Sequence, residues 1–264
     1  MSASTSDHIS GEPTVLLERE NGIATLTLNN PEKLNAMSAA MRAILGDHLQ
    51  TIAADPDIRI VLLQGLGRAF CVGADTSDLP STPLAWRDRI LTAQLHHIAL
   101  IKMNKIVIAS VQGAAAGGGA SLALAADILI MADDATLRFP FVRLGLIPDG
   151  GCSYLLQSKL GVPTALDLML TGGTMDAEEA RQLGLTRRVV PSTKLQEATQ
   201  ALIAELLALP HEALMLTKSV SRQTWTNTME AAMGHEADAF ALATAMPGHQ
   251  RALAAAQARH KKKE

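Results

Sequence analysis

Short apolar runs alternate with amphipathic stretches along the first 190 residues, and this pattern predicts strands that alternate with helices. Residues 15–19 and 23–28 are typical of two strands, and the Asn21-Gly22 pair between them favours a tight hairpin turn. The remaining predicted strands cover residues 58–64, 106–111, 127–131, 135–139 and 185–190. Such alternation indicates an α/β core.

Helix signals fill the gaps between these strands and dominate the C-terminal part. Ser38 is placed to cap a helix that runs to about residue 53, and Asp75 could cap a short helix of its own. The other predicted helices cover residues 84–102, 120–126, from about 152, 163–170, from about 174, and nearly all of 194–263 with breaks at Pro210 and 246–248. We therefore predict a flexible N-terminal tail (1–13), an α/β core (14–191) and a C-terminal helical region (192–264).

The stretch from residue 106 to 122 is the candidate centre of the chain, because a buried strand is followed by Gly117-Gly118-Gly119 and then by a helix start. Glycines let a ligand approach the backbone closely, and a helix N-terminus offers unpaired N–H donors to negative charge. Tight packing of helix on strand explains the glycines equally well. The spacing fits neither a P-loop nor a dinucleotide-binding fingerprint. A second glycine-rich loop follows another strand at 65–75 and could supply a second N–H donor.

Composition excludes several functional classes. The chain has 264 residues, enough for one large domain with an appendage, and its net charge of −3 gives no reason to expect a nucleic-acid partner. Its two cysteines, Cys71 and Cys152, suggest neither a disulfide framework nor a metal cluster. No apolar run reaches membrane-spanning length. We expect a cytoplasmic protein with no metal site, no membrane contact and no nucleic-acid partner.

Four blocks, at residues 30–36, 69–75, 117–127 and 144–151, occur in the order and at the spacings of one family. Over about residues 15–209 the chain resembles the enoyl-CoA hydratase/isomerase, or crotonase, family. The resemblance implies a spiral of ββα units with C-terminal helices that build a homotrimer or a dimer of trimers. It also implies an acyl-CoA thioester as the substrate and no separate cofactor.

The resemblance assigns roles to individual residues. It implies that the backbone N–H groups of Ala74 and Gly118 bind the thioester oxygen, so that an enolate formed beside it is stabilised. The further residues expected at the substrate or CoA are Glu32, Lys33, Leu34, Ala36, Asp75, Thr76, Gly117, Ser121 and Phe141. The last two occupy the positions of the two glutamates that hydratases of this family use, so efficient hydration is not expected.

Asp149 is the candidate acid/base. By its position alone it could be only a turn or helix-cap residue, but some isomerases of this family place their catalytic carboxylate there. The branch that isomerises ring epoxides and enoyl-CoA double bonds is the most similar, and it too lacks both hydratase glutamates. We expect Asp149 to carry a proton from C2 to C4 of an enoyl-CoA, with its pKa raised by the apolar neighbours Phe141, Leu146 and Ile147.

Two other functions remain open. In an aryl-CoA dehalogenase Asp149 would be a nucleophile, and His97, which lies near the position of the helper histidine, would assist it. His96 and His97 are expected to be exposed or half-buried on different faces of a helix. The chain could also be a non-catalytic CoA-binding relative. It departs from the family at residues 252–256, where an Ala-rich run replaces the usual contact with a neighbouring subunit.

Overall fold

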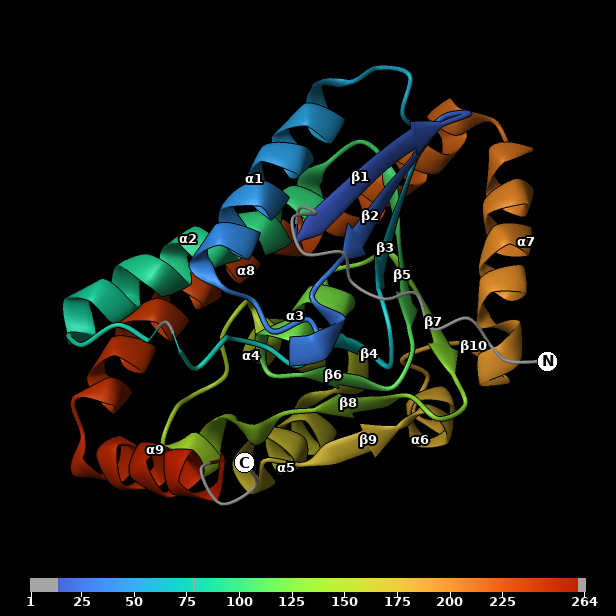
Figure 1. Cartoon of the computed structure of the whole chain (residues 1–264). Coiled ribbons are helices and arrows are strands. Elements are labelled where there is room, and N and C mark those ends of the chain that lie inside the picture. The colour runs from blue at the N-terminus through green and yellow to red at the C-terminus, as the bar shows by residue number, and fades with distance from the viewer. Residues whose placement is uncertain (1–13, 78, 261–264) are drawn as a thin grey trace.

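The computed structural model describes residues 14–77 and 79–260, so the predicted tail of residues 1–13 lies outside the described part. Within that part the larger sheet has six strands, in the order β1-β2-β3-β5-β7-β10 (Figure 1). Its strands are β1 (Val15–Glu20), β2 (Ile23–Leu28), β3 (Ile60–Gly65), β5 (Ile106–Val111), β7 (Ile128–Ala132) and β10 (Arg188–Val190). In this larger sheet of the described residues, the pair of β1 and β2 is the antiparallel one. The two strands are joined by the predicted Asn21-Gly22 turn, in which both residues have positive φ.

A second sheet of the described residues has four strands of three residues each, in the order β4-β6-β8-β9. In Figure 1 it lies below the first sheet, and its strands run across those of the larger sheet. The strands are β4 (Ala69–Cys71), β6 (Ala114–Ala116), β8 (Thr136–Arg138) and β9 (Thr174–Asp176). Of these, only β8 was predicted as a strand, because three residues are too few for a periodic pattern.

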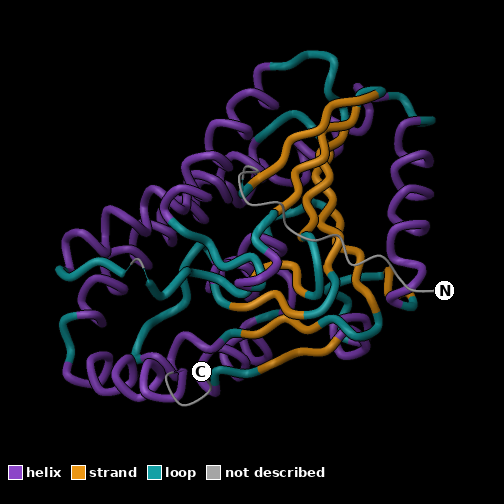
Figure 2. The backbone as a smooth tube through the Cα atoms, in the orientation of Figure 1, coloured by secondary structure: helices purple, strands orange, loops and turns teal. Residues whose placement is uncertain are grey.

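The chain moves between the two sheets in a repeating order. Strand β3 joins the first sheet, β4 joins the second, and a helix follows; β5, β6 and the next helix repeat this, and β7 and β8 begin the third unit. This is the predicted spiral of ββα units. The tube in Figure 2 shows the helices arranged around the crossed strands.

The helices begin and end close to the predicted positions. Ser38, Thr82 and Asp176 cap three of them by accepting a backbone N–H bond from the residue three positions later. The helices are α1 (Ala39–Ala54), α2 (Pro83–Lys102), α3 (Gly118–Leu124), α4 (Cys152–Leu160), α5 (Val162–Thr171), α6 (Ala177–Gln182), α7 (Leu195–Leu207), α8 (His211–Thr244) and α9 (Pro247–His260), with 3₁₀ turns η1 (Pro31–Lys33), η2 (Pro140–Leu144) and η3 (Ser192–Lys194). No described helix is both long and apolar enough to cross a lipid bilayer.

Asp75 does not cap a helix, contrary to the prediction. Its side chain instead accepts hydrogen bonds from the backbone and the hydroxyl of Ser77, which closes a local turn. These bonds, with a contribution from Lys33, lower the pKa of Asp75 to about 2.

The C-terminal helices pack on the core of the same chain. Helix α8 lies along α2, and the Asp127 carboxylate holds it by ion pairs with Lys218 at 2.8 Å and Arg222 at 2.5 Å. Helix α9 then turns back onto η2, where His249 Nδ1 lies 2.6 Å from the carbonyl oxygen of Leu144. The two helices therefore close one side of the region between α2 and α3.

Candidate active site

A cavity of about 320 Å³ lies where α2, α3, η2, α8 and α9 meet. Its wall is mainly apolar, with Trp86, Phe141 and Phe240 as its large side chains. Of the residues predicted for the site, it brings together Ala74, Thr76, Gly117, Gly118, Phe141 and Asp149. An apolar cavity with a few convergent polar groups is typical of a small-molecule site.

The two predicted oxyanion donors come from neighbouring loops on this wall. Gly117 has φ 53° and ψ −126°, a conformation that favours glycine, and it lets α3 begin at Gly118 with an N–H that has no partner within the helix. On the other loop, Ala74 lies opposite Met37 in a short parallel β-bridge. The Met37 N–H donates to the Gly73 carbonyl oxygen and the Asp75 N–H donates to the Met37 carbonyl oxygen, so the Ala74 N–H takes no part in this bridge. A Cβ on Gly73 would lie 3.4 Å from the Gly118 nitrogen, so the two loops are in close contact.

Asp149 faces the same place from the loop before α4. A Cβ on Gly118 would lie 3.7 Å from its Oδ1, which puts the carboxyl beside the start of α3. Burial raises the pKa of Asp149 to about 6, and the positive charge of Arg89 on α2 lowers it in part. The predicted raised pKa of this carboxyl is confirmed, and at neutral pH the group is mostly ionised.

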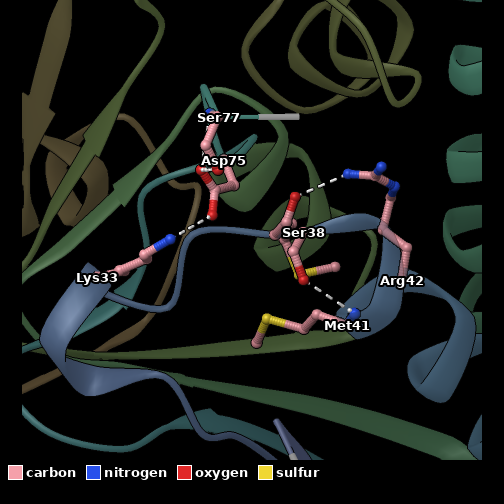
Figure 3. Close-up of polar contacts among 7 residues, drawn as sticks. Lys33, Ser38, Met41, Arg42, Asp75 and Ser77 are labelled. Carbon is pink, nitrogen blue, oxygen red and sulfur yellow. Dashed lines mark hydrogen bonds and ion pairs between the residues drawn. The ribbon is translucent and has the colours of Figure 1, made fainter. Parts of the chain in front are cut away.

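The residues predicted for the CoA end lie away from the cavity wall. Figure 3 shows Lys33 on the loop before α1, with its ammonium group 3.1 Å from Asp75 Oδ2. In the same view Ser38 caps α1 through the Met41 N–H, and Arg42 Nη1 donates a 2.7 Å hydrogen bond to the carbonyl oxygen of Met37. Glu32, Leu34, Ala36 and Asp75 belong to these two loops and do not line the cavity. Their role in CoA binding stays a prediction.

Comparison with known proteins agrees with this geometry. The model of the family described as Enoyl-CoA hydratase/isomerase matches residues 18–259. The chain belongs to this enoyl-CoA hydratase/isomerase family. It is 37% identical over 231 residues to the 1,2-epoxyphenylacetyl-CoA isomerase of Escherichia coli K12, covering 85% of this chain and 87% of that protein.

Solved structures of the enoyl-CoA hydratase/isomerase family share the fold. An enoyl-CoA hydratase from Mycobacterium avium subsp. paratuberculosis superposes with a TM-score of 0.86 at 27% identity, over 93% of this chain and 100% of that one. A Thermobifida fusca protein solved in complex with CoA gives a TM-score of 0.74 at 33% identity, over 84% of this chain and 91% of that one. Relatives of this family member thus carry both hydratase and isomerase names.

Phe141 and Ser121, which the resemblance matches to the two hydratase glutamates, lie in different places relative to the cavity. Phe141 is buried in the cavity wall, and its ring lies 3.9 Å from the place of a Cβ on Gly117. Ser121 is fully buried and does not line the cavity. Its hydroxyl donates to the carbonyl oxygen of Asp149 at 2.9 Å, so it supports the Asp149 backbone from behind.

The exposure predicted for the two histidines is wrong. His96 and His97 are 7% and 5% exposed, because Gly46 of α1 packs against His96 and Gly150, on the loop before α4, packs against His97. Burial lowers the pKa of His97 to about 4, and its Nδ1 lies 3.1 Å from the Ala93 carbonyl oxygen. His97 is therefore a neutral ring with its Nδ1–H committed to its own helix.

Several residues of the site were not predicted. Trp86, Phe240, His249 and Leu253 come to the cavity from α2, α8 and α9, and Trp86 packs against Phe240 with ring centroids 5.2 Å apart. A carboxylate, Glu236, is buried on α8 behind α4. The sequence predicts α2 only as a helix of the core, and α8 and α9 only as part of a C-terminal helical region. Only the few aromatic and charged residues of these helices could have marked them as part of the site.

Proposed function

We propose that this protein isomerises the double bond of an enoyl-CoA, moving it from the 3 to the 2 position. The observation that carries the proposal is the Asp149 carboxyl, which has a pKa of about 6 and faces the cavity beside the start of α3. The proposal needs acyl-CoA as substrate and no further cofactor. The CoA-bound Thermobifida fusca structure and the name of the Escherichia coli relative support a CoA thioester ligand.

In the proposed reaction the thioester oxygen lies between the N–H groups of Ala74 and Gly118. Removal of a proton from C2 moves electrons toward that oxygen, and each preorganised donor lowers the barrier by about 3 kcal/mol. Asp149 then holds the proton and returns it to C4. A carboxyl with a pKa near 6 suits both steps, because it is ionised at neutral pH and is still a useful acid once protonated.

The side chains at the hydratase positions favour isomerisation over hydration. Hydration uses two acid/base groups around one water, each worth roughly 100- to 10,000-fold in rate. Here one position is the buried Ser121 and the other is the Phe141 ring. A single carboxylate is enough for a proton shuttle between two carbons of one substrate.

The dehalogenase alternative requires a base beside Asp149, and His97 is the candidate on this wall. Its Nε2 is buried, and a Cβ on Gly150 would lie only 2.8 Å from it. This enclosure favours a packing role for His97. The non-catalytic alternative predicts binding of acyl-CoA without turnover.

A substrate panel with the purified protein separates these functions. We expect a 3-enoyl-CoA to be converted to the conjugated 2-enoyl-CoA, with slower water addition to a 2-enoyl-CoA and no halide release from a 4-halobenzoyl-CoA. Faster hydration than isomerisation would contradict the proposal, and halide release would support the dehalogenase. Binding of acyl-CoA with no reaction would support the non-catalytic alternative.

We also propose that the chain works in the cytoplasm as a homotrimer or a dimer of trimers. Leu216 and Val220 on α8 are 65% and 68% exposed. Exposed large apolar side chains that lie one helical turn apart favour a contact with another protein subunit. Analytical ultracentrifugation gives the mass directly. A monomer at micromolar concentration would contradict this assembly.

A further inference from the structure

Helix α4 begins directly after the Asp149 turn, and a buried carboxylate from α8 holds its first residues. Glu236 accepts hydrogen bonds from the Gly151 N–H at 2.8 Å and from the Ser153 N–H at 3.0 Å, and the Ser153 hydroxyl also donates to it. The N-cap residue of α4 is Gly151, which has no side chain to accept these N–H groups. Glu236 on α8 therefore caps the N-terminus of α4 in place of an N-cap side chain.

The same turn is held on its other side by α3. Ser121 donates to the Asp149 carbonyl oxygen at 2.9 Å, and the Cys152 N–H donates to that oxygen at 3.0 Å. The backbone from Asp149 to Gly151 thus lies between fixed contacts from α3 and α8. A shift of Glu236 would move this backbone, and the Asp149 carboxyl would move with it.

The contacts of α8 also keep Glu236 itself in place. Gln94 on α2 donates a 2.9 Å hydrogen bond to the Met233 carbonyl oxygen, one turn before Glu236 on α8. The Met233 side chain lies 3.2 Å from the place of a Cβ on Gly151. Glu236 is only 5% exposed, so its side chain has little freedom to leave the α4 N-terminus.

The charged and titratable groups around this turn come from three helices. The charge of Arg89 on α2 acts on Asp149, His97 on α2 lies beside Gly150, and the charges of Glu236 and Asp149 both act on the Cys152 thiol on α4. Burial, with a smaller contribution from the Asp149 charge, raises the pKa of Glu236 to about 7, against the bonds from Ser153 and Gly151. His97 and the Cys152 thiol are neutral near pH 7, since burial lowers the first pKa and raises the second.

We propose that Glu236 is a positioning residue that fixes the Asp149–Gly151 turn. Its effect on the rate rests on the isomerase function proposed above, because that function assigns the reacting carboxyl to Asp149. The fixed backbone of the turn does not depend on that function.

The kinetic test is E236Q, which keeps the size of the side chain and one accepting oxygen but removes the charge. We expect kcat on a 3-enoyl-CoA to fall by about 10- to 100-fold, with KM changed less than about threefold, because a displaced reacting group loses rate rather than affinity. The matched control is E178Q, which removes an exposed carboxylate on α6 and should change neither constant. Wild-type kcat in E236Q would overturn the positioning role.

The second readout is the backbone amide chemical shifts of Asp149 and Gly150 by ¹⁵N NMR. We expect E236Q to shift these signals from their wild-type positions, and E178Q to leave them in place. A cap with a purely structural role would lower the melting temperature of E236Q and leave these two signals unchanged. That result would overturn the positioning role.

The two readouts separate the two proposals. If the wild type does not isomerise any enoyl-CoA, the proposed function fails, while the amide shifts of E236Q still show whether Glu236 fixes the turn. If the wild type isomerises and E236Q leaves both kcat and the amide shifts unchanged, the inference about Glu236 fails and the proposed function stands.

Discussion

The hydroxyl of Ser121 donates a 2.9 Å hydrogen bond to the backbone carbonyl oxygen of Asp149. Ser121, which the family resemblance matches to a hydratase glutamate position, is thus a buried support for the carboxylate proposed to react. We expect S121A to destabilise the fold by about 1 kcal/mol, the usual net value of one hydrogen bond. Steady-state kinetics should show a lower kcat with an almost unchanged KM. A variant with full kcat would show that this contact does not position Asp149.

Gly73 sets the distance between the two loops that carry the oxyanion donors. A Cβ at this position would lie 2.8 Å from the Ala116 carbonyl oxygen, and its φ of 91° disfavours any side chain. We expect G73A to push the Ala74 loop off α3 and to lower kcat by about 100-fold or more, the cost of losing one donor. The measurement is kcat on a 3-enoyl-CoA.

The control for this variant is G184A. Gly184 has a similar φ of 77° but nothing within 4 Å of an added Cβ, so it carries the backbone strain without the clash. G184A should lose some stability and keep its kcat. If both variants lose the same activity, strain rather than the donor geometry explains the effect of G73A.

The raised pKa of Asp149 predicts both a pH profile and a stability change. Its pKa of about 6 means that the base form is lost below that pH, so kcat should rise with pH through about 6. In the unfolded chain the same carboxyl titrates near 3.8, so between these values the folded state binds the extra proton. The contribution of Asp149 to stability therefore falls as pH rises through this window and stays unfavourable above it.

Thermal unfolding of D149N checks the second half of this prediction. We expect D149N to unfold at a higher temperature than the wild type at pH 7.5, and the difference to shrink toward pH 4. About two pKa units correspond to an upper limit of about 3 kcal/mol. A D149N protein less stable than the wild type at pH 7.5 would contradict the buried, costly carboxylate described here.

The buried charges under α8 make a separate prediction about the fold. Asp127 pairs with both Lys218 and Arg222, and its carboxylate also accepts the Val107 N–H at 2.8 Å. Removal of one partner leaves buried charge uncompensated, so D127N should destabilise the protein by about 3 to 5 kcal/mol in a urea titration. The exposed pair of Arg181 and Glu178 is the comparison, and E178Q should leave the urea midpoint nearly unchanged.

The sequence predicted most of the elements because their signals are local. Ser38 and Asn21-Gly22 act within four residues of their own positions, and the apolar runs of β3 and β5 are six residues long. The strands of the second sheet escaped, apart from β8, because they have three residues each. Aspartate is a residue type that often caps helices, but the carboxylate of Asp75 accepts hydrogen bonds from the hydroxyl and N–H of Ser77 in a turn instead.

The candidate site was predictable only for the residues that lie in the loops of the four family-like blocks. The blocks at 69–75 and 144–151 predicted Ala74 and Asp149 as site residues, and both line the cavity together with Gly118. The burial of His97 depends on how α2 packs against the loop that holds Gly150, and the reach of Glu236 to Gly151 depends on how α8 packs against α4. A contact between residues 85 positions apart leaves no periodic signal in the sequence.

The most direct test of the central claim is the ratio of kcat for D149N and the wild type on one 3-enoyl-CoA. The Asn side chain keeps the volume of the carboxyl but cannot take a proton from C2. We predict that kcat falls by about 1,000-fold or more, within the range for loss of a general base, while the affinity for the acyl-CoA stays within a few-fold. A D149N enzyme that isomerises at more than a tenth of the wild-type rate would contradict the account.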